Sequence, residues 1–411
     1  MTAARPSHWP MTLFPVIADC LQIGGIPLTR LAARIGQTPF YAYDRRLLDE
    51  RMALLRRTLP SAIELHYAVK ANPMPALVQH MAGLVDGLDV ASLGELRVAL
   101  DTGMAPARIS FAGPGKRPPE LIAAIAAGIT LNLESAHELE TVARLGREQR
   151  RRPRVAMRIN PDFELKASGM KMGGGPKPFG VDAEQAPALL QRIGELELDF
   201  EGFHIFTGSQ NLRAAAIVET HDRTFELALR LATDAPGPVR SLNIGGGFGI
   251  PYFPGDTPLD LQPIAANLER WLPTVKERLP QARVVLELGR YLVGEAGLYV
   301  AEVVDRKVSR GHTFLITNGG LHHHLAVSGN FGQVVRKNYP VVVGNKVVGT
   351  EREVVTVVGP LCTPLDILAD RMDLAKADIG DLIVVFQSGA YGLTASPTAF
   401  LSHPACVEVL V

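Results

Sequence analysis

Cysteine, tryptophan and any surplus of charge are scarce in this sequence of 411 residues. Its three cysteines, Cys20, Cys362 and Cys406, include no CxxC pair, so neither a disulfide framework nor a structural zinc site is expected. Lysine plus arginine and aspartate plus glutamate both number 42, which argues against nucleic acid as a partner. No apolar run is long enough to span a bilayer. We therefore expect a cytoplasmic protein, without signal peptide, membrane segment or metal site, that binds small molecules or other protein chains.

The composition does allow a large core, since 47% of the residues are hydrophobic. Between residues 40 and 296, short β-branched runs alternate with longer segments of helical period. This rhythm predicts a (β/α)8 barrel, with a doubly wound sheet as the alternative. The expected strands are Glu64 to Val69, Gly87 to Val90, Arg108 to Ala112, Ile129 to Leu133, Arg154 to Ile159, Phe200 to Ile205, Ser241 to Ile244 and Arg283 to Glu287.

The composition of the sequence changes after about Gly297, where valine-rich runs replace the segments of helical period. The expected strands there are Tyr299 to Val308, Tyr339 to Val348, Glu353 to Val358 and Leu382 to Phe386. We therefore predict a barrel domain over residues 40–296 and an all-β domain made of residues 1–39 and 297–411.

Lys70 stands at the end of the first expected barrel strand, in the run His66 to Pro73. A lysine ammonium in apolar surroundings finds a partner, loses its proton or forms an imine with a carbonyl. The alternative is a strand-end lysine whose stem lies on the core while its ammonium reaches water.

Other polar and glycine residues also fall at expected strand ends, where the active site of a barrel lies. Gly245, Gly246 and Gly247 allow backbone N–H groups to approach a phosphate, although a plain turn explains them equally. Glu287 can hold a ring nitrogen protonated and Arg290 can bind a phosphate, unless the two form only a local ion pair. With Lys70, this set matches the aldehyde, the phosphate and the pyridine nitrogen of pyridoxal 5'-phosphate. Arg158 and His204 converge on the same mouth.

The motifs resemble those of the fold-type III pyridoxal phosphate decarboxylases, which include the diaminopimelate, ornithine and arginine decarboxylases. They follow in matching order from Tyr41 to Val411: His66 to Asn72, Ser92 to Leu96, Gly208 to Gln210, Gly245 to Gly249, Glu287 to Arg290, Gly359 to Cys362 and Gly389 to Tyr391. The resemblance implies an alanine-racemase-like barrel, a C-terminal β-sandwich and a homodimer with shared active sites.

By resemblance, Lys70 holds the cofactor as an imine and Glu287 pairs with its pyridine nitrogen. Ser209, residues Gly245 to Gly247, Arg290 and Tyr391 would hold the phosphate. Cys362, from the partner subunit, would return a proton to the carbanion formed on decarboxylation; a cysteine that only fills the core is the alternative. Either His204 or Phe206 stacks on the cofactor, because Phe206 stands where the family has a histidine.

Departures from the family pattern concern the substrate. Cys362-Thr363-Pro364 lacks the carboxylate that relatives place there for a distal ammonium, and His322, His323 and His324 occupy a region where diaminopimelate enzymes carry an arginine. Adjacent histidines cannot readily share a metal ion, so we expect loop or interface residues. Arg158, His322, Thr363 and Tyr391 are the candidates for substrate contact.

The glycine-rich loop from Ser168 to Gly180 resembles that of the relatives that decarboxylate glutamate in antibiotic and exopolysaccharide pathways, including the butirosin enzyme for carrier-bound glutamate. Lys171 or Lys177 there could meet an acidic partner; a solvated basic loop is the alternative. We expect a pyridoxal phosphate-dependent amino-acid decarboxylase, acting on a free diamino acid or on an amino acid that is modified or tethered to a carrier protein. A racemase and a non-catalytic cofactor-binding protein are the alternatives from other classes.

Overall fold

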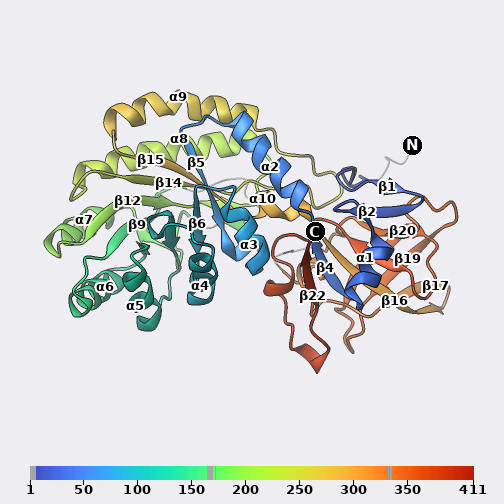
Figure 1. The fold of residues 1–411 in the computed structure, drawn as a ribbon. Helices are drawn as coiled ribbons and strands as arrows, with labels where there is room; N and C mark the ends of the chain where they lie inside the picture. The colour runs from blue at the N-terminus through green and yellow to red at the C-terminus, as the bar shows by residue number, and fades with distance from the viewer. Residues whose placement is uncertain (1–5, 164–169, 172, 332, 334–335) are drawn as a thin grey trace. The chain divides into compact units, whose positions relative to one another are not determined.

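The computed structural model describes residues 6–163, 170–171, 173–331, 333 and 336–411 of the chain. They form two compact units, each assembled from separate stretches of sequence (Figure 1). The barrel unit comprises Arg51–Ile250 and Pro258–Leu292. The sheet unit comprises the described residues up to Glu50, Pro251–Thr257 and Val293–Val411.

Eight parallel strands close on themselves in the barrel unit, which confirms the predicted barrel. The last pairing joins β8 to β9, so no strand edge is left open. In order around the barrel the strands are β5 (Ile63–Ala68), β6 (Gly87–Val90), β7 (Ile109–Phe111), β8 (Thr130–Leu133), β9 (Arg154–Asn160), β12 (Asp199–Ile205), β14 (Ser241–Gly246) and β15 (Arg283–Leu288).

Helices cover the outside of the barrel (Figure 1). Two of them start where the sequence offers a serine cap: Ser92 accepts a hydrogen bond from Glu95 N, and Ser135 accepts one from Glu138 N. On the longest pair, the rings of Phe225 and Trp271 stack with centroids 5.0 Å apart. The helices are α2 (Arg45–Thr58), α3 (Pro75–Ala82), α4 (Leu93–Asp101), α5 (Pro118–Ala127), α6 (Ala136–Gln149), α7 (Ala186–Glu195), α8 (Ala214–Leu231) and α9 (Gln262–Arg278).

Charged side chains occupy the starts of the barrel strands. Glu64 lies 2.7 Å from the guanidinium of Arg108 and 3.2 Å from that of Arg283. Glu201 pairs with Arg154 at 2.6 Å. Because these charges neutralise one another at one end of the strands, the opposite, carboxyl end is left for chemistry.

The sheet unit contains a mixed sheet in the order β18-β21-β16-β17-β19-β20, which β4 and β22 extend from β16. A smaller sheet is made of β1 (Val16–Ile17), β2 (Cys20–Ile23) and β3 (Ile26–Pro27). The strands of the mixed sheet are β4 (Phe40–Tyr43), β16 (Gly297–Ser309), β17 (His312–Thr317), β18 (Val341–Val343), β19 (Arg352–Val358), β20 (Ile367–Ala375), β21 (Leu382–Val385) and β22 (Val407–Leu410).

The first strand of the mixed sheet comes from a segment that the sequence analysis had placed with the barrel. Residues Phe40–Tyr43 pair antiparallel with β16 and parallel with β22, and all four side chains are buried. Their unbroken apolar run suits a central strand, which is covered on both faces. The run expected over 339–348 is ordered as a strand only at Val341–Val343.

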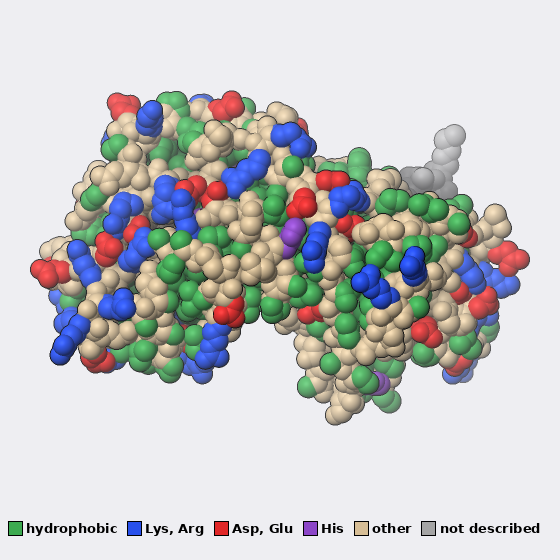
Figure 2. Space-filling model, in the orientation of Figure 1, with side chains coloured by type: hydrophobic (Ala, Val, Ile, Leu, Met, Phe, Trp, Pro, Cys, Tyr) green, Lys and Arg blue, Asp and Glu red, His purple; other side chains and the backbone are tan. Residues whose placement is uncertain are grey.

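The surface shows no dominant sign of charge. Figure 2 shows basic and acidic side chains interspersed over the visible face, as the net charge of zero leads one to expect. Within the described part of the chain, no helix has both the length and the apolar character needed to cross a membrane.

Candidate active site

Lys70 lies just beyond β5, in the short 3-10 turn Val69–Ala71. Its side chain is 40% exposed, and its Nζ is 3.6 Å from Oε1 of Glu287. The ammonium also lies 5.5 Å from the centre of the Phe206 ring. The structure therefore brings together three of the predicted site residues, and it presents the lysine amine at the carboxyl end of the barrel.

Glu287, on β15, is buried beside two further polar side chains. Nε2 of His204 lies 3.0 Å from its Oε2, and Nδ2 of Asn243 donates a hydrogen bond of 3.3 Å to the same oxygen. Burial alone would raise the pKa of Glu287, but Lys70 and His204 outweigh it and hold that pKa well below its usual range. Glu287 is therefore ionised, as a carboxylate that faces a protonated ring nitrogen must be.

The predicted phosphate cradle is built from two adjacent loops. Asn211 N donates to Gly247 O at 2.9 Å, which ties the loop after β12, containing Ser209, to the glycine loop after β14. Gly245 and Gly247 both have φ of +72°, and a Cβ on Gly246 would overlap the carbonyl of Glu287. Only glycine meets both demands, so no side chain projects from these three positions, where a phosphate group is predicted to bind.

The two aromatic rings that the sequence left as alternatives have different surroundings. His204 is fully buried and contacts Glu287, whereas Phe206 is half-buried and faces Lys70. Phe206 is therefore the ring next to the reactive amine.

Arg158, on β9, is also buried, and its guanidinium is held by a carboxylate that the sequence analysis did not single out. Nη1 of Arg158 donates to Oε1 of Glu134 at 2.8 Å, and the guanidinium carbon lies 5.1 Å from the centre of the Phe179 ring. Glu134 directly follows β8, so the rule that selected Lys70, a polar residue at a strand end, would have found it too.

Arg290 begins the short helix α10 (Arg290–Val293) directly after β15. Gly289, the residue before it, packs so closely on the lysine turn that an added Cβ would lie 2.9 Å from that of Ala71. The absence of a side chain at Gly289 thus lets the start of α10 approach the turn that carries Lys70.

Cys362, in the sheet unit, is exposed on the loop between β19 and β20. The loop is anchored by Asp366, which accepts hydrogen bonds from Leu361 N at 2.9 Å and Leu321 N at 2.6 Å. Thr363 is half-buried beside the cysteine, and its hydroxyl accepts a weak 3.4 Å bond from Leu365 N. The thiol is therefore presented to the outside of its unit by a loop with a fixed base.

The three adjacent histidines lie in the loop that follows β17, and their side chains are buried within the sheet unit. The ring of His322 lies 3.8 Å from that of His323 and 5.0 Å from that of His403. His324 Nε2 lies 3.0 Å from the hydroxyl of Ser388. Burial lowers the pKa of all three, to about 4 for His322 and about 3 for His324. These imidazoles are neutral at pH 7.

Tyr391, the last predicted site residue, is half-buried and has a φ of +53°. A positive φ is uncommon for a residue with a bulky side chain, so the surrounding structure holds Tyr391 in this conformation.

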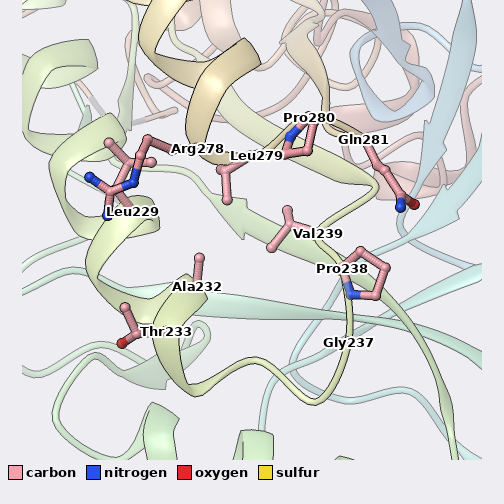
Figure 3. Close-up of a pocket in the computed structure, with 10 residues that line it drawn as sticks. All are labelled: Leu229, Ala232, Thr233, Gly237, Pro238, Val239, Arg278, Leu279, Pro280 and Gln281. Atoms are coloured by element: carbon pink, nitrogen blue, oxygen red, sulfur yellow. The ribbon is translucent and has the colours of Figure 1, made fainter.

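The pocket in Figure 3 lies away from these groups. Its volume is about 200 Å³, and it lies between the end of α8, the loop before β14 and the residues that follow α9. Arg278 is the only charged side chain among the residues that line it. It holds neither an amine nor a carboxylate for catalysis, and it lies at the amino ends of the strands.

Comparison with known proteins agrees with this geometry. Residues 45–294 match the family described as "Pyridoxal-dependent decarboxylase, pyridoxal binding domain". The chain is 38% identical over 389 residues to the L-glutamyl-[BtrI acyl-carrier protein] decarboxylase of Niallia circulans, covering 93% of this chain and 90% of that protein. It is 32% identical over 398 residues to the diaminopimelate decarboxylase of Aquifex aeolicus, covering 95% of this chain and 90% of that one.

A solved structure gives the same result for the fold. The crystal structure of a point mutant of diaminopimelate decarboxylase from Helicobacter pylori, complexed with L-lysine, superposes with a TM-score of 0.82 at 26% identity. The match covers 93% of this chain and 94% of the other.

The barrel residues fit pyridoxal phosphate. The amine of Lys70, the ionised Glu287 and the glycine cradle that a Cβ would fill provide one partner each for its aldehyde, ring nitrogen and phosphate. The chain belongs to the pyridoxal-dependent decarboxylase family and is a pyridoxal phosphate-dependent amino-acid decarboxylase.

Proposed function

We propose that this enzyme decarboxylates an amino acid whose far end is modified or tethered to a carrier protein. The observation that carries this proposal is the loop Cys362-Thr363-Pro364, which offers no carboxylate to a distal ammonium. The 38% identity to an enzyme named for a glutamyl carrier protein supports the same substrate class. A substrate without a free distal charge needs no charged partner at that point.

Each barrel residue has one role in the proposed reaction. Pyridoxal phosphate, when bound, supplies the sink for the electron pair left by the departing carboxylate. Lys70 would bind the aldehyde of the cofactor through its amine. Glu287 would keep the ring nitrogen protonated, and Phe206 would be the aromatic side chain beside the ring. Ser209, residues Gly245 to Gly247, Arg290 and Tyr391 would hold the phosphate.

Cys362 acts as the proton donor in this proposal. Its thiol gives a proton to the carbon that has lost its carboxylate, and solvent later restores that proton. Arg158, His322, Thr363 and Tyr391 stay the proposed substrate contacts. Of these, Arg158 is held in place by Glu134, whereas His322 has no exposed surface in its unit and is the least supported of the four.

The active site is proposed to form between two copies of the chain in the cytoplasm. The exposure of Cys362, with Leu365 57% exposed beside it, supports donation of this loop to a partner subunit. Phe331, Phe400 and Leu401 of the same unit are also exposed, and apolar side chains of this kind are typical of subunit interfaces.

A free diamino acid is the second candidate substrate, because the diaminopimelate decarboxylase of Aquifex aeolicus is 32% identical over most of both chains. In that case the distal group would be recognised by residues other than Thr363.

Release of carbon dioxide from two sets of compounds tests the proposal. One set holds free diaminopimelate, ornithine, lysine, arginine and glutamate, and the other holds the L-glutamyl acyl-carrier protein for which the Niallia circulans relative is named. Turnover of the carrier-bound glutamate, with no turnover of the free acids, is the expected result. Rapid turnover of a free diamino acid would replace the proposal by the second candidate.

A further inference from the structure

Glu134 binds more partners than its place after β8 would suggest. The carboxylate is buried, and it accepts three hydrogen bonds from three different segments. Oε1 accepts from Arg158 Nη1 at 2.8 Å and from Gly113 N at 2.5 Å, and Oε2 accepts from Gly180 N at 3.1 Å. Burial opposes its ionisation, but Arg158 and Lys116 nevertheless hold the pKa of Glu134 below its usual value.

One of these partners ends a segment at the carboxyl end of the barrel, residues 173–180, which we call the mouth segment. Its first part is held by Asn160, whose Oδ1 accepts from Gly174 N at 3.0 Å and whose Nδ2 donates to Gly175 O at 2.9 Å. Gly173 N donates to Thr207 O at 3.1 Å, close to Ser209. The mouth segment is thus fastened to β9 and to the loop after β12.

The other end of the mouth segment is held in two ways. Glu134 accepts a hydrogen bond from Gly180 N, and the next two residues form β11 (Val181–Asp182), which pairs with β9. Gly180 has a φ of +74°, and an added Cβ would lie 2.9 Å from Asn160 N, so this end packs directly on β9. Phe179 lies under the guanidinium of Arg158, which Glu134 also holds. A single carboxylate therefore fixes both the backbone at Gly180 and the cation that contacts Phe179.

The same cation acts on the reactive groups. Arg158 is among the charges that lower the pKa of Glu287, the carboxylate next to Lys70. Glu134 neutralises Arg158, so its own charge limits how strongly Arg158 opposes a cation at Lys70.

We propose that Glu134 is a positioning residue that fastens the mouth segment over the site and, through Arg158, balances the charge at Lys70. In this proposal the substrate passes the mouth segment on its way to Lys70. Because Glu134 holds that segment in one position, it helps determine which amino acids reach Lys70. This inference rests on the proposed function only in making Lys70 the cofactor anchor.

Limited proteolysis of the cofactor-loaded protein tests the mechanical part. Chymotrypsin can cut after Phe179, and Glu134→Gln should speed that cut by about tenfold to a hundredfold, because a buried carboxylate–guanidinium pair is broken. Glu201→Gln is the matched control, since Glu201 is buried and pairs with Arg154 on the same strand, β9, but at its opposite end. Equal cutting of the wild type and Glu134→Gln, or equally fast cutting of the control, would overturn the proposal.

A spectroscopic titration of the same proteins tests the electrostatic part. In Glu134→Gln the unbalanced Arg158 should lower the midpoint of the pH-dependent cofactor absorbance by about one pH unit. Glu134→Asp keeps the charge but shortens the side chain, so it should speed the cut and leave the midpoint in place; it also serves if the glutamine variant does not fold. An unmoved midpoint in Glu134→Gln would refute the coupling. Both readouts stay valid if no compound tried releases carbon dioxide, so failure of the proposed function is recognised separately.

Discussion

The strands of the barrel unit bury ionisable side chains in their charged form, whereas the core of the sheet unit buries histidines in their neutral form. In the barrel, burial is outweighed by opposite charges: the pKa of Glu64 falls to about 2, and that of His66 rises to about 9 beside Asp89. In the sheet unit burial dominates, so the pKa of His322 falls to about 4 and that of His324 to about 3. The barrel strands hold Glu64 and His66 charged, whereas the sheet unit holds its histidine cluster neutral.

This difference in protonation indicates which unit can stabilise the charged groups that a reaction requires. A buried charge survives only beside a partner, and the closed ring of parallel strands supplies partners on both sides of each position. Imidazoles stacked on one another and on aromatic rings have no such partners. The barrel unit is therefore suited to stabilising ionic states during a reaction, whereas the sheet unit provides a neutral support for the Cys362 loop.

The largest expected effect comes from removing the amine of Lys70, at the carboxyl end of the barrel. Lys70→Ala should reduce carbon dioxide release by about a thousandfold or more and abolish the absorbance of the bound cofactor, because the covalent anchor is gone. Lys276→Met is the control, since Lys276 is an exposed lysine of the barrel unit on α9. If Lys70→Ala kept a cofactor band that borohydride fixes to the protein, another lysine would be the anchor.

Next comes the reactive group of the sheet unit. Cys362→Ser should lower product formation by about a hundredfold, or divert it to transamination, and leave cofactor absorbance unchanged, because a hydroxyl is a poorer proton donor than a thiol. Product analysis by mass spectrometry distinguishes these fates. Cys20→Ser, at a half-buried cysteine of the same unit, is the control. Unchanged rate and unchanged products would show that the thiol has no part in proton transfer.

Removing one charge from a buried barrel pair tests the comparison through stability. Asp89 lies 3.3 Å from Nδ1 of His66, so Asp89→Asn leaves a buried cation without its main partner and should cost about 3 kcal/mol of unfolding free energy at pH 7. Because the pKa of His66 is raised when the protein folds, its contribution is complete below pH 6.5 and is lost as the pH rises through about 9.

Urea unfolding at pH 6 and at pH 10 should therefore show a large cost of Asp89→Asn at the lower pH and a small one at the higher pH. Asp101→Asn, at an exposed position of α4, should cost nothing at either pH. An equal cost of Asp89→Asn at both values would mean that His66 is not charged in the folded protein.

The smallest effect concerns the neutral histidines. Since the pKa of His322 is lowered when the protein folds, the unfolded chain binds more protons between about pH 4 and 6.5, and stability falls as the pH falls through that range. His322→Leu should reduce proton uptake on unfolding at pH 5 by about one proton. The exposed His137, changed to leucine, should leave it unaltered. An unchanged slope of stability against pH in His322→Leu would show that the cluster is already protonated in the fold.

The eight barrel strands could be predicted to within two residues of their ends, because short β-branched and apolar runs alternate with longer segments of helical period along this part of the chain. The strand β20 could not. It lies at the edge of its sheet and carries Asp370 and Arg371 among its apolar residues, so it lacks the continuous run used to find the others.

Within the candidate site, the residues that approach the reactive groups could be predicted, but those that hold them could not. Lys70 and Glu287 stand at strand ends and belong to recognisable motifs. Glu134 also stands at a strand end, but it lies in none of these motifs. Because it directly precedes Ser135, which caps α6, it resembles part of a helix start. Asp366 accepts its two hydrogen bonds from backbone N–H groups, which every residue type except proline carries, so no sequence pattern marks its partners.

The pairing of β4 with β16 and β22 has a consequence for synthesis on the ribosome. Phe40–Tyr43 emerges early, yet both strands that flank it are encoded in the last third of the chain. At about 5–20 residues per second, this fully apolar segment waits for tens of seconds without its neighbours. The whole barrel is translated in that interval, so the segment stays an unpaired apolar strand of the kind that chaperones protect.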